Sequence, residues 1–339
     1  MASEMTRRDF VKVGSAGAAA ALVMSSAGVG AAPPPMPERA LGRTGHTVRL
    51  FSLGGQATLE KPGTREASLA IINRAIDLGV NYIDTAAAYG RSREPGNTTP
   101  PISQSYIGEV MKTRRREVFL ASKTHDRTRD GSLKLLEESL TLLNTDHLDL
   151  WQLHNVRTDE QLDQIFGKDG AIEALTKARD QRMVRFLGIT GHFDPAILSK
   201  GLERFPFDCL LVALNPADRH RLSFIDDLLP LANRQQLGII GMKIPARGRL
   251  LRADGISSMR QAMAYTLSLP ISTVIVGCDT VAQLEENVAL ARDFTPMAEG
   301  EMRKLEALTA SYVAEASWFK RPATPPAASR FHHDDQNTD

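Results

Sequence analysis

A repeated alternation of short apolar segments with helical patterns is the feature that most constrains the fold of this chain. Eight segments are rich in apolar residues: 50–53, 80–83, 118–122, 148–153, 184–189, 209–214, 238–242 and 273–276. Polar residues or a glycine follow the last seven at intervals of 25 to 39 residues: Asp84, Lys123, His154, Thr190, Asn215, Lys243 and Gly277. This spacing predicts parallel β/α units.

Amphipathic helices are predicted between these strands. Leu69, Ile72 and Ile76 recur at helical spacing after Thr64, a candidate N-cap. Eight such units predict a closed (β/α)8 barrel, whose functional residues lie at the carboxyl ends of the strands. A doubly wound open sheet is the alternative, but no glycine-rich dinucleotide fingerprint follows any strand. We therefore expect the barrel, preceded by a small hairpin over residues 41–48.

Composition supports one large globular domain. The chain has 339 residues, of which 42% are hydrophobic, and a formal net charge of +1. This near-neutral balance gives no reason to expect nucleic acid or an anionic membrane surface as a partner. Cys209 and Cys278 are too few for a four-thiolate cluster or a disulfide scaffold, and we expect buried thiols.

The amino-terminal segment differs from the rest of the chain. Arg7 and Arg8 form a twin-arginine pattern, followed by an apolar run over 13–29 and small residues up to Ala32. This order predicts a signal peptide over 1–32, recognised by the Tat export machinery and cleaved near Ala32. A disordered leader or an uncleaved anchor are the alternatives. The run is short for a stable spanning helix, so we expect a periplasmic mature chain without stable membrane insertion.

Asp84, Tyr89, Lys123 and His154 follow three successive strands and suggest acid–base chemistry. Tyrosine has a reference pKa of about 10 and is a poor acid at neutral pH unless a nearby positive charge lowers it. A lysine that reaches both the phenol and a carboxylate meets this need. Each residue alone is typical of a solvated loop, but their joint placement at strand ends indicates a site.

These residues carry a resemblance to the aldo-keto reductase family. It rests on G-V-N-Y-I-D-T-A-x-x-Y-G over 79–90, Ser122-Lys123, and D-x-L-D-L-x-Q-L-H ending at His154, and it extends over residues 41–287. The resemblance implies NAD(P)H-dependent, reversible reduction of a small aldehyde or ketone by a barrel over 38–319 with the hairpin at its floor. It implies that Tyr89 is the general acid, that Lys123 depresses its pKa, that Asp84 holds the lysine, and that His154 orients the carbonyl.

The segment after the eighth strand is a candidate cofactor site. A turn that enters a helix N-terminus suits phosphate, and the resemblance implies that residues 277–287 clamp the adenosine half. The residues concerned are Gly277, Cys278, Asp279, Gln283, Glu286 and Asn287, the last two against adenine. Members that prefer NADPH place Lys or Arg at the positions of Gly277, Asp279 or Gln283. None is basic here, and the acidic Asp279 would repel the additional phosphate of NADPH, so NADH is predicted at least to match NADPH.

Other cofactor positions depart from the family pattern. Thr190-Gly191 stand where Ser-Asn usually grip the carboxamide, Leu211 replaces a glutamine, and Met242-Lys243 replace a Tyr-Ser pair. We expect Met242 to pack against the nicotinamide and Thr190 or Asn215 to replace the lost hydrogen bonds, and Lys243 is a further expected cofactor contact. Gly54, after the first strand, would let a cofactor or substrate approach the backbone closely.

Two other functions are compatible with the sequence. A metal-dependent hydrolase would use Asp84, His125, Asp126, His154 and His192, but it lacks an H-x-H ligand pair and leaves Tyr89 and Lys123 without a role; no metal site is predicted. A nucleotide-binding sensor without turnover is suggested only by the altered carboxamide pocket. Residues 91–101 are expected to form a loop over the site or a surface excursion, and residues 320–339 a disordered tail.

Overall fold

The computed structural model describes residues 34–92 and 100–321 of the chain. From Pro35 onward these residues belong to one compact unit. The predicted signal peptide, most of the loop over 91–101 and nearly all of the predicted tail lie outside the described residues. None of the described helices is long and apolar enough to cross a membrane.

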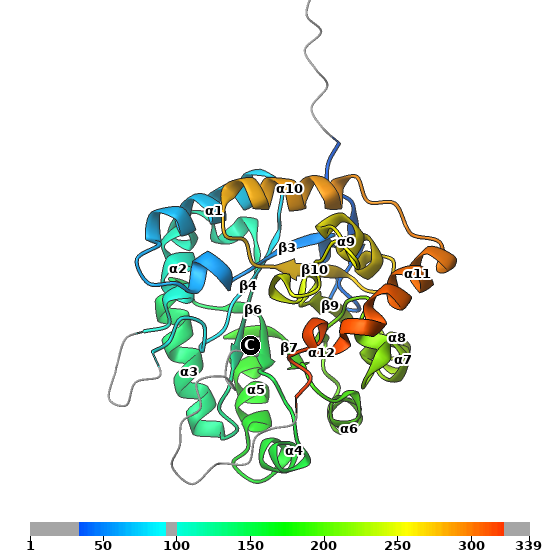
Figure 1. Cartoon of the computed structure of the whole chain (residues 1–339). Helices are drawn as coiled ribbons and strands as arrows, with labels where there is room; N and C mark the ends of the chain where they lie inside the picture. Colours follow the sequence, from blue (N-terminus) through cyan, green and yellow to red (C-terminus); the bar gives the residue numbers. More distant parts are fainter. Residues whose placement is uncertain (1–33, 93–99, 322–339) are drawn as a thin grey trace, which may run out of the picture. The chain divides into compact units, whose positions relative to one another are not determined.

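Eight parallel strands close into a barrel (Figure 1). They are β3 Phe51–Gly54, β4 Tyr82–Asp84, β5 Phe119–Thr124, β6 Leu148–Leu153, β7 Val184–Gly191, β8 Cys209–Ala213, β9 Gly238–Met242 and β10 Thr273–Val276. Strand β10 pairs with β3, with Val276 opposite Leu53, and this pairing closes the sheet. The predicted barrel is confirmed, and the open doubly wound sheet is excluded.

Helices surround the barrel and cover the outward faces of its strands (Figure 1). They are α1 Arg65–Asp77, α2 Ile102–Arg114, α3 Arg129–Leu142, α4 Asp159–Phe166, α5 Ala171–Asp180, α6 Pro195–Arg204, α7 Phe224–Asp227, α8 Leu229–Arg234, α9 Met259–Leu267, α10 Val281–Arg292, α11 Glu299–Thr309 and α12 Val313–Ala316. Thr64 precedes α1 as predicted, but its side chain caps no helical N–H. Its hydroxyl instead donates to the carbonyls of Thr58 and Lys61, at 2.7 and 2.8 Å.

The predicted hairpin lies at the amino-terminal ends of the barrel strands. Its strands, β1 Glu38–Ala40 and β2 Thr47–Arg49, are antiparallel and flank the turn. Gly42 has a φ of 53°, and a Cβ there would lie 2.2 Å from the nitrogen of Gly238, the first residue of β9. Arg43 reaches the carbonyl of Phe207 before β8, at 2.9 Å. The hairpin therefore sits at the barrel floor.

The packed structure extends one residue beyond the predicted carboxyl-terminal boundary. Lys320, expected in a disordered tail, is fully buried and forms an ion pair with the buried Asp218. Its ammonium also donates to the carbonyls of Arg221 and Leu222, at 2.9 and 2.8 Å. Both cysteines, Cys209 and Cys278, are free and buried, as predicted.

Candidate active site

The loop after β4 holds Tyr89 over the barrel. Asp84 ends β4 opposite Ala121 of β5, and the Ala87 N–H donates to the Lys123 carbonyl at 3.2 Å. Gly90 has a φ of 72°, and a Cβ there would lie 2.7 Å from the Glu60 carbonyl oxygen, so this turn requires glycine. Backbone contacts to the next strand therefore fix where the phenol lies, and Tyr89 is 7% exposed.

Lys123 joins the carboxylate and the phenol. Its side chain and that of Asp84 are each 1% exposed, and the two form an ion pair. The ammonium also donates to the Thr85 carbonyl at 2.9 Å and to the Tyr89 hydroxyl oxygen at 3.3 Å. One cation thus contacts both Asp84 and Tyr89, the arrangement that proton transfer by a phenol needs.

Gln152, which the sequence analysis did not single out, supports Asp84 from the neighbouring side. Its amide nitrogen donates to Asp84 Oδ1 at 3.3 Å, and the side chain is fully buried. Burial raises the pKa of Asp84, whereas the Lys123 ammonium and the Gln152 hydrogen bond oppose that rise. Gln152 lies two residues before His154, and period-two alternation along a strand was the signal available for finding it.

His154 completes the group at the carboxyl end of β6. Its backbone N–H donates to the Thr124 carbonyl at 2.8 Å, and its side chain is 1% exposed. The imidazole meets the Tyr89 ring edge to face, with ring centroids 5.7 Å apart. The structure therefore brings together all four predicted catalytic residues.

The two residues expected to replace the carboxamide contacts hydrogen-bond with the protein itself. The Thr190 hydroxyl accepts from the Asn155 N–H at 2.8 Å. The Asn215 amide donates to the Lys243 carbonyl at 3.3 Å, and its oxygen accepts from the Ala217 N–H at 2.9 Å. Both side chains are buried. In this structure Thr190 joins β7 to the loop after β6, and Asn215 joins the loop after β8 to the loop after β9.

The loop after β9 contains residues in the left-handed backbone region. Lys243, Ala246 and Arg247 have φ values of 58°, 48° and 54°. Residues other than glycine rarely adopt this backbone conformation, and such strained residues cluster at functional sites. Met242, at the end of β9, is 7% exposed, and the Trp318 indole donates to the Ala246 carbonyl at 3.2 Å.

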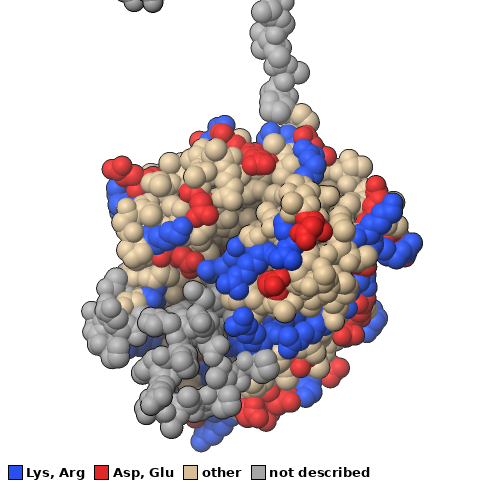
Figure 2. Space-filling model, viewed as in Figure 1, with Lys and Arg blue, Asp and Glu red and all other residues tan. Residues whose placement is uncertain are grey.

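Positive side chains gather on the face of the molecule shown in Figure 2. The loop after β9 carries Arg247, Arg249 and Arg252. Arg247 pairs with Glu60 at 3.4 Å and Arg252 with Glu315 at 3.3 Å. Arg249 lies 4.9 Å from the centre of the Trp318 ring. These three cations therefore all lie on the loop that follows β9, at the carboxyl end of the barrel strands.

The loops after β3 and β10 pack against each other. A Cβ at Gly54 would lie 3.0 Å from the Gly277 nitrogen, and one at Gly277 would lie 3.0 Å from the Gln56 carbonyl oxygen. The missing side chain at Gly54 therefore makes room for the end of β10, and the close approach of a ligand to its backbone stays a prediction.

Asp279 forms an ion pair that the sequence analysis did not foresee. Its carboxylate accepts from the Lys61 ammonium at 2.8 Å, and its backbone carbonyl accepts from the Thr58 hydroxyl at 2.9 Å. The cap of α10 is Thr280, whose hydroxyl accepts from the Gln283 N–H at 3.1 Å. Asp279 therefore does not cap α10, and a lysine from the loop after β3 compensates its charge.

Three of the predicted adenosine contacts, Cys278, Gln283 and Asn287, form hydrogen bonds within segment 277–287. The Asn287 amide donates to the Cys278 sulfur at 3.6 Å, and both side chains are buried. Burial raises the pKa of the Cys278 thiol to about 12. The Gln283 side-chain oxygen accepts from the Asp279 N–H at 2.6 Å. Glu286 is the other predicted adenine contact. Its side chain is exposed and forms no hydrogen bond with another residue in the described part of the chain.

Residues 50–255 match the family model described as the Aldo/keto reductase family. This match covers more than half of the chain and includes the four predicted catalytic residues Asp84, Tyr89, Lys123 and His154. The chain belongs to the aldo/keto reductase family. It is an NAD(P)-dependent oxidoreductase that interconverts carbonyl compounds and alcohols.

Curated relatives of this aldo/keto reductase are oxidoreductases. The chain is 24% identical over 298 residues to an uncharacterized oxidoreductase, YqkF, of Bacillus subtilis, with 74% of this chain and 90% of the relative covered. It is 27% identical over 289 residues to L-galactose dehydrogenase of Arabidopsis thaliana, with 74% and 86% covered.

Solved structures share the fold. The aldo-keto reductase AKR11C1 of Bacillus halodurans, in its holo form, gives a TM-score of 0.67 at 21% identity, with 80% of this chain and 96% of that chain covered. An aldo-keto reductase of Klebsiella pneumoniae in complex with NADPH gives 0.64 at 21% identity, with 77% and 91% covered.

The alternative of a metal-dependent hydrolase finds no support in this aldo/keto reductase. Within residues 34–92 and 100–321, no three His, Cys, Asp or Glu side chains are grouped as metal ligands. His192 instead lies beside Asn155, with 3.0 Å between its Nδ1 and the amide oxygen. Its ring also meets that of Phe319, with centroids 6.2 Å apart.

Proposed function

We propose that this aldo/keto reductase reduces an aldehyde or ketone with Tyr89 as the proton donor and Lys123 as the cation that makes the phenol acidic enough. The observation that carries the proposal is the 3.3 Å contact between the Lys123 ammonium and the Tyr89 oxygen. Asp84 fixes this ammonium in place. A positive charge at that distance stabilises the negative charge that forms on the phenol oxygen when it releases its proton.

Each of the four residues has a defined task in this scheme. A bound nicotinamide supplies the hydride, and the carbonyl oxygen gains negative charge as its carbon is reduced. Tyr89 transfers its hydroxyl proton to that oxygen, and Lys123 stabilises the phenolate left behind. His154, whose ring lies 5.7 Å from that of Tyr89, orients the carbonyl. Asp84 and Gln152 hold the lysine and do not contact the substrate.

The residues at the barrel mouth fit a nicotinamide dinucleotide. The N-terminus of α10 and the turn before it offer backbone N–H groups for phosphate. Lys61 contacts Asp279 in this turn, and Lys243 and Arg247 contact Gln56 and Glu60 in the neighbouring loop after β3. Met242 presents a thioether suited to packing against a flat ring. The NADPH in the Klebsiella pneumoniae structure supports this cofactor class.

A panel of small aldehydes and ketones tests the proposal. Cofactor oxidation is followed by loss of nicotinamide absorbance, with NADH and NADPH tested separately. We expect at least one carbonyl compound to be reduced, and Lys123→Met to abolish most of that rate. If the cofactor quenches protein fluorescence but no carbonyl compound is reduced and no alcohol is oxidised, the protein is a nucleotide-binding sensor.

We further propose that the chain is exported folded to the periplasm through the Tat machinery. The twin-arginine pattern at Arg7 and Arg8 and the apolar run after it support this proposal. A reporter fused after Ala32 is expected to reach the periplasm, and export is expected to stop when both arginines are replaced by lysine. Export through the unfolded-chain route would contradict it. The enzyme isolated from the periplasm is expected to carry bound cofactor.

A further inference from the structure

A pocket lies at the floor of the barrel, at the opposite end from Tyr89 and Lys123. Its volume is about 380 Å³, in the range of small-molecule sites. Phe119 begins β5, and Asp149 and Arg185 are the second residues of β6 and β7. Because a strand rises about 3.3 Å per residue, four residues along β5 separate this floor from Lys123 by about 13 Å.

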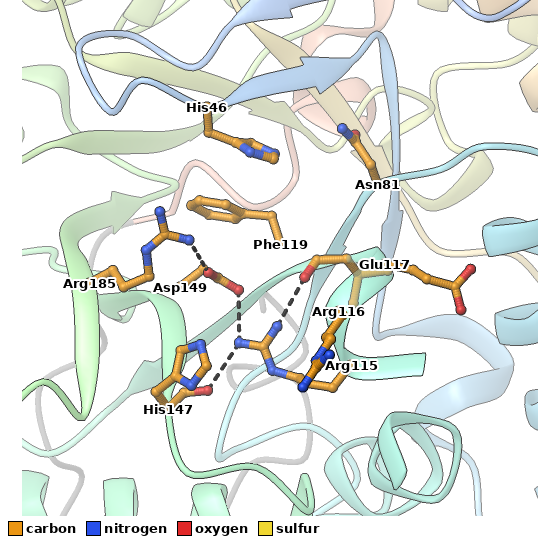
Figure 3. A pocket seen from close by; sticks show the side chains of 10 residues that line it. His46, Asn81, Arg115, Arg116, Glu117, Phe119, His147, Asp149 and Arg185 are labelled. Atoms are coloured by element: carbon orange, nitrogen blue, oxygen red, sulfur yellow. Dashed lines mark hydrogen bonds and ion pairs between the residues drawn. The ribbon is translucent and has the colours of Figure 1, made fainter. Parts of the chain in front are cut away.

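The carboxylates that line the pocket are already engaged by arginines (Figure 3). Arg115 and Arg185 lie on either side of Asp149 and donate to its two oxygens at 2.8 and 2.7 Å. Glu117 turns away from them and accepts two hydrogen bonds of 2.9 Å from the guanidinium of Arg114. The carboxylates of Asp149 and Glu117 are therefore both engaged and do not neutralise the remaining arginines of the pocket.

The arginines that line the pocket therefore retain positive charge and hydrogen-bond donors that no carboxylate of the lining uses. Arg115 directs most of its donors to the protein, because it also donates to Thr145 and to the carbonyls of Val118 and His147. Arg185 uses one terminal nitrogen on Asp149, and its side chain is 53% exposed. Arg116 is exposed and forms no ion pair with any residue of 34–92 or 100–321. Asp149 balances only one of its two arginines, so the lining has a positive excess.

His46 adds a buried polar atom and an aromatic surface. Its Nε2 is buried and has no hydrogen-bond partner among the described residues, and its ring stacks on Phe119 with centroids 4.6 Å apart. In the tautomer that carries its proton on Nε2, this buried N–H lacks an acceptor, and a bound oxyanion would supply one. The imidazole and the Phe119 ring also provide a flat apolar wall.

We propose that this floor pocket binds a small organic anion, a phosphate ester or a carboxylate, with Arg185, Arg116 and His46 as its donors. Guanidinium groups match the geometry of both oxyanions. The volume exceeds what a bare ion fills, and the His46–Phe119 wall accommodates an organic part. The site is separate from the carbonyl-reducing site and does not depend on its chemistry.

Nuclear magnetic resonance of the full chain tests this site without measuring turnover. The His46 imidazole signal, assigned by its loss in His46→Gln, is followed while inorganic phosphate or citrate is added at constant ionic strength. We expect a saturable shift, with affinity at least tenfold weaker in Arg185→Gln and several-fold weaker in Arg116→Gln. The Arg116 variant keeps the test valid if loss of the Arg185–Asp149 pair disturbs folding. The tighter of the two anions identifies the ligand class.

Two control variants separate the pocket from other cationic surfaces. Arg234→Gln removes one exposed charge from α8, and Arg247→Gln removes one beside the opposite end of the barrel. Both are expected to leave the His46 titration unchanged. The proposal is overturned if chloride produces the same shift, which would indicate an adventitious ion only. It is also overturned if Arg185→Gln and Arg116→Gln titrate like the unmodified protein.

Discussion

The Lys61 ammonium lies 2.8 Å from the Asp279 carboxylate and so connects the loop after β3 to the loop after β10. Both side chains are more than half exposed, at 56% and 58%. Asp279 alone would repel the additional phosphate of NADPH, and this repulsion was the basis for predicting that NADH at least matches NADPH. Lys61 offsets that charge, so the preference for NADH is expected to be small.

Replacing Lys61 by Met is therefore predicted to shift the preference toward NADH. A unit charge at about 4 Å is worth about 4 kcal/mol at an effective dielectric of 20, and exposure reduces this to about 1–2 kcal/mol. The ratio of kcat/KM values for NADPH and NADH should fall roughly tenfold. Asp279→Asn should raise it, and Lys112→Met, an exposed lysine in α2, should not change it. An unchanged ratio in both loop variants would place the cofactor elsewhere.

Gln152→Leu is predicted to reduce turnover and to alter its pH dependence. The variant removes a hydrogen bond worth about 1–3 kcal/mol to the ionised Asp84, so kcat should fall roughly tenfold. The pKa of Asp84 is already raised by burial and should rise further, which moves the acidic limb of the pH–rate profile to higher pH. Gln104→Leu, another buried glutamine, is the control and should lower stability without moving that limb.

The buried pair of Lys320 and Asp218 is predicted to stabilise the fold through charge compensation. Lys320→Met leaves the Asp218 carboxylate buried without its cation, and this typically costs about 3–5 kcal/mol. Adding Asp218→Asn should recover part of the loss, as measured by urea unfolding. Lys304→Met, on the exposed face of α11, is the control. A double variant no more stable than Lys320→Met would show that charge compensation is not the cause.

Much of the architecture was predictable because its signals are local. The eight strands are short apolar runs at regular intervals, and β6, β9 and β10 have the predicted bounds. Asp84, Lys123 and His154 were predictable because each ends or follows a strand of a parallel barrel, where the carboxyl ends converge. Tyr89 lies in a short loop pinned to the neighbouring strand. Topology therefore brings Asp84, Lys123 and His154 together, and the contacts of the loop after β4 add Tyr89.

The contacts that were missed join segments far apart in the chain. Lys61 and Asp279 are separated by 218 residues and lie in loops without a recognisable motif. The side chain of Asn287 donates to the sulfur of Cys278, a contact that no sequence pattern indicated, and its predicted contact with adenine stays a prediction. Sequence patterns indicate which element a residue occupies, whereas the rotamer and the partner depend on packing that becomes definite only in the closed barrel.

Asp149 is predicted to make stability fall in acid. Burial raises its pKa, but Arg115, Arg185 and the Leu120 N–H outweigh that effect and lower it below the ordinary value. A carboxylate with a depressed folded-state pKa stabilises the fold above its unfolded pKa of about 3.9 and loses this contribution as the pH falls through the folded value.

The free energy of unfolding should therefore decrease as the pH is lowered beyond about 4. Asp149→Asn should be less stable at pH 7 and show a shallower decline in that range. An identical decline in both proteins would assign the acid sensitivity to other carboxylates.

The most direct test of the catalytic role of Tyr89 is a comparison of turnover and cofactor affinity in Tyr89→Phe. The substitution removes only the hydroxyl, which lies 3.3 Å from Lys123. With the best carbonyl substrate of the panel, kcat should fall by roughly 10²-fold or more, while the dissociation constant for the cofactor, measured by fluorescence quenching, stays nearly unchanged. Tyr106→Phe in α2 should retain full activity. If Tyr89→Phe keeps its turnover, the proton comes from another group, with His154 the first to examine, and the proposed mechanism is wrong.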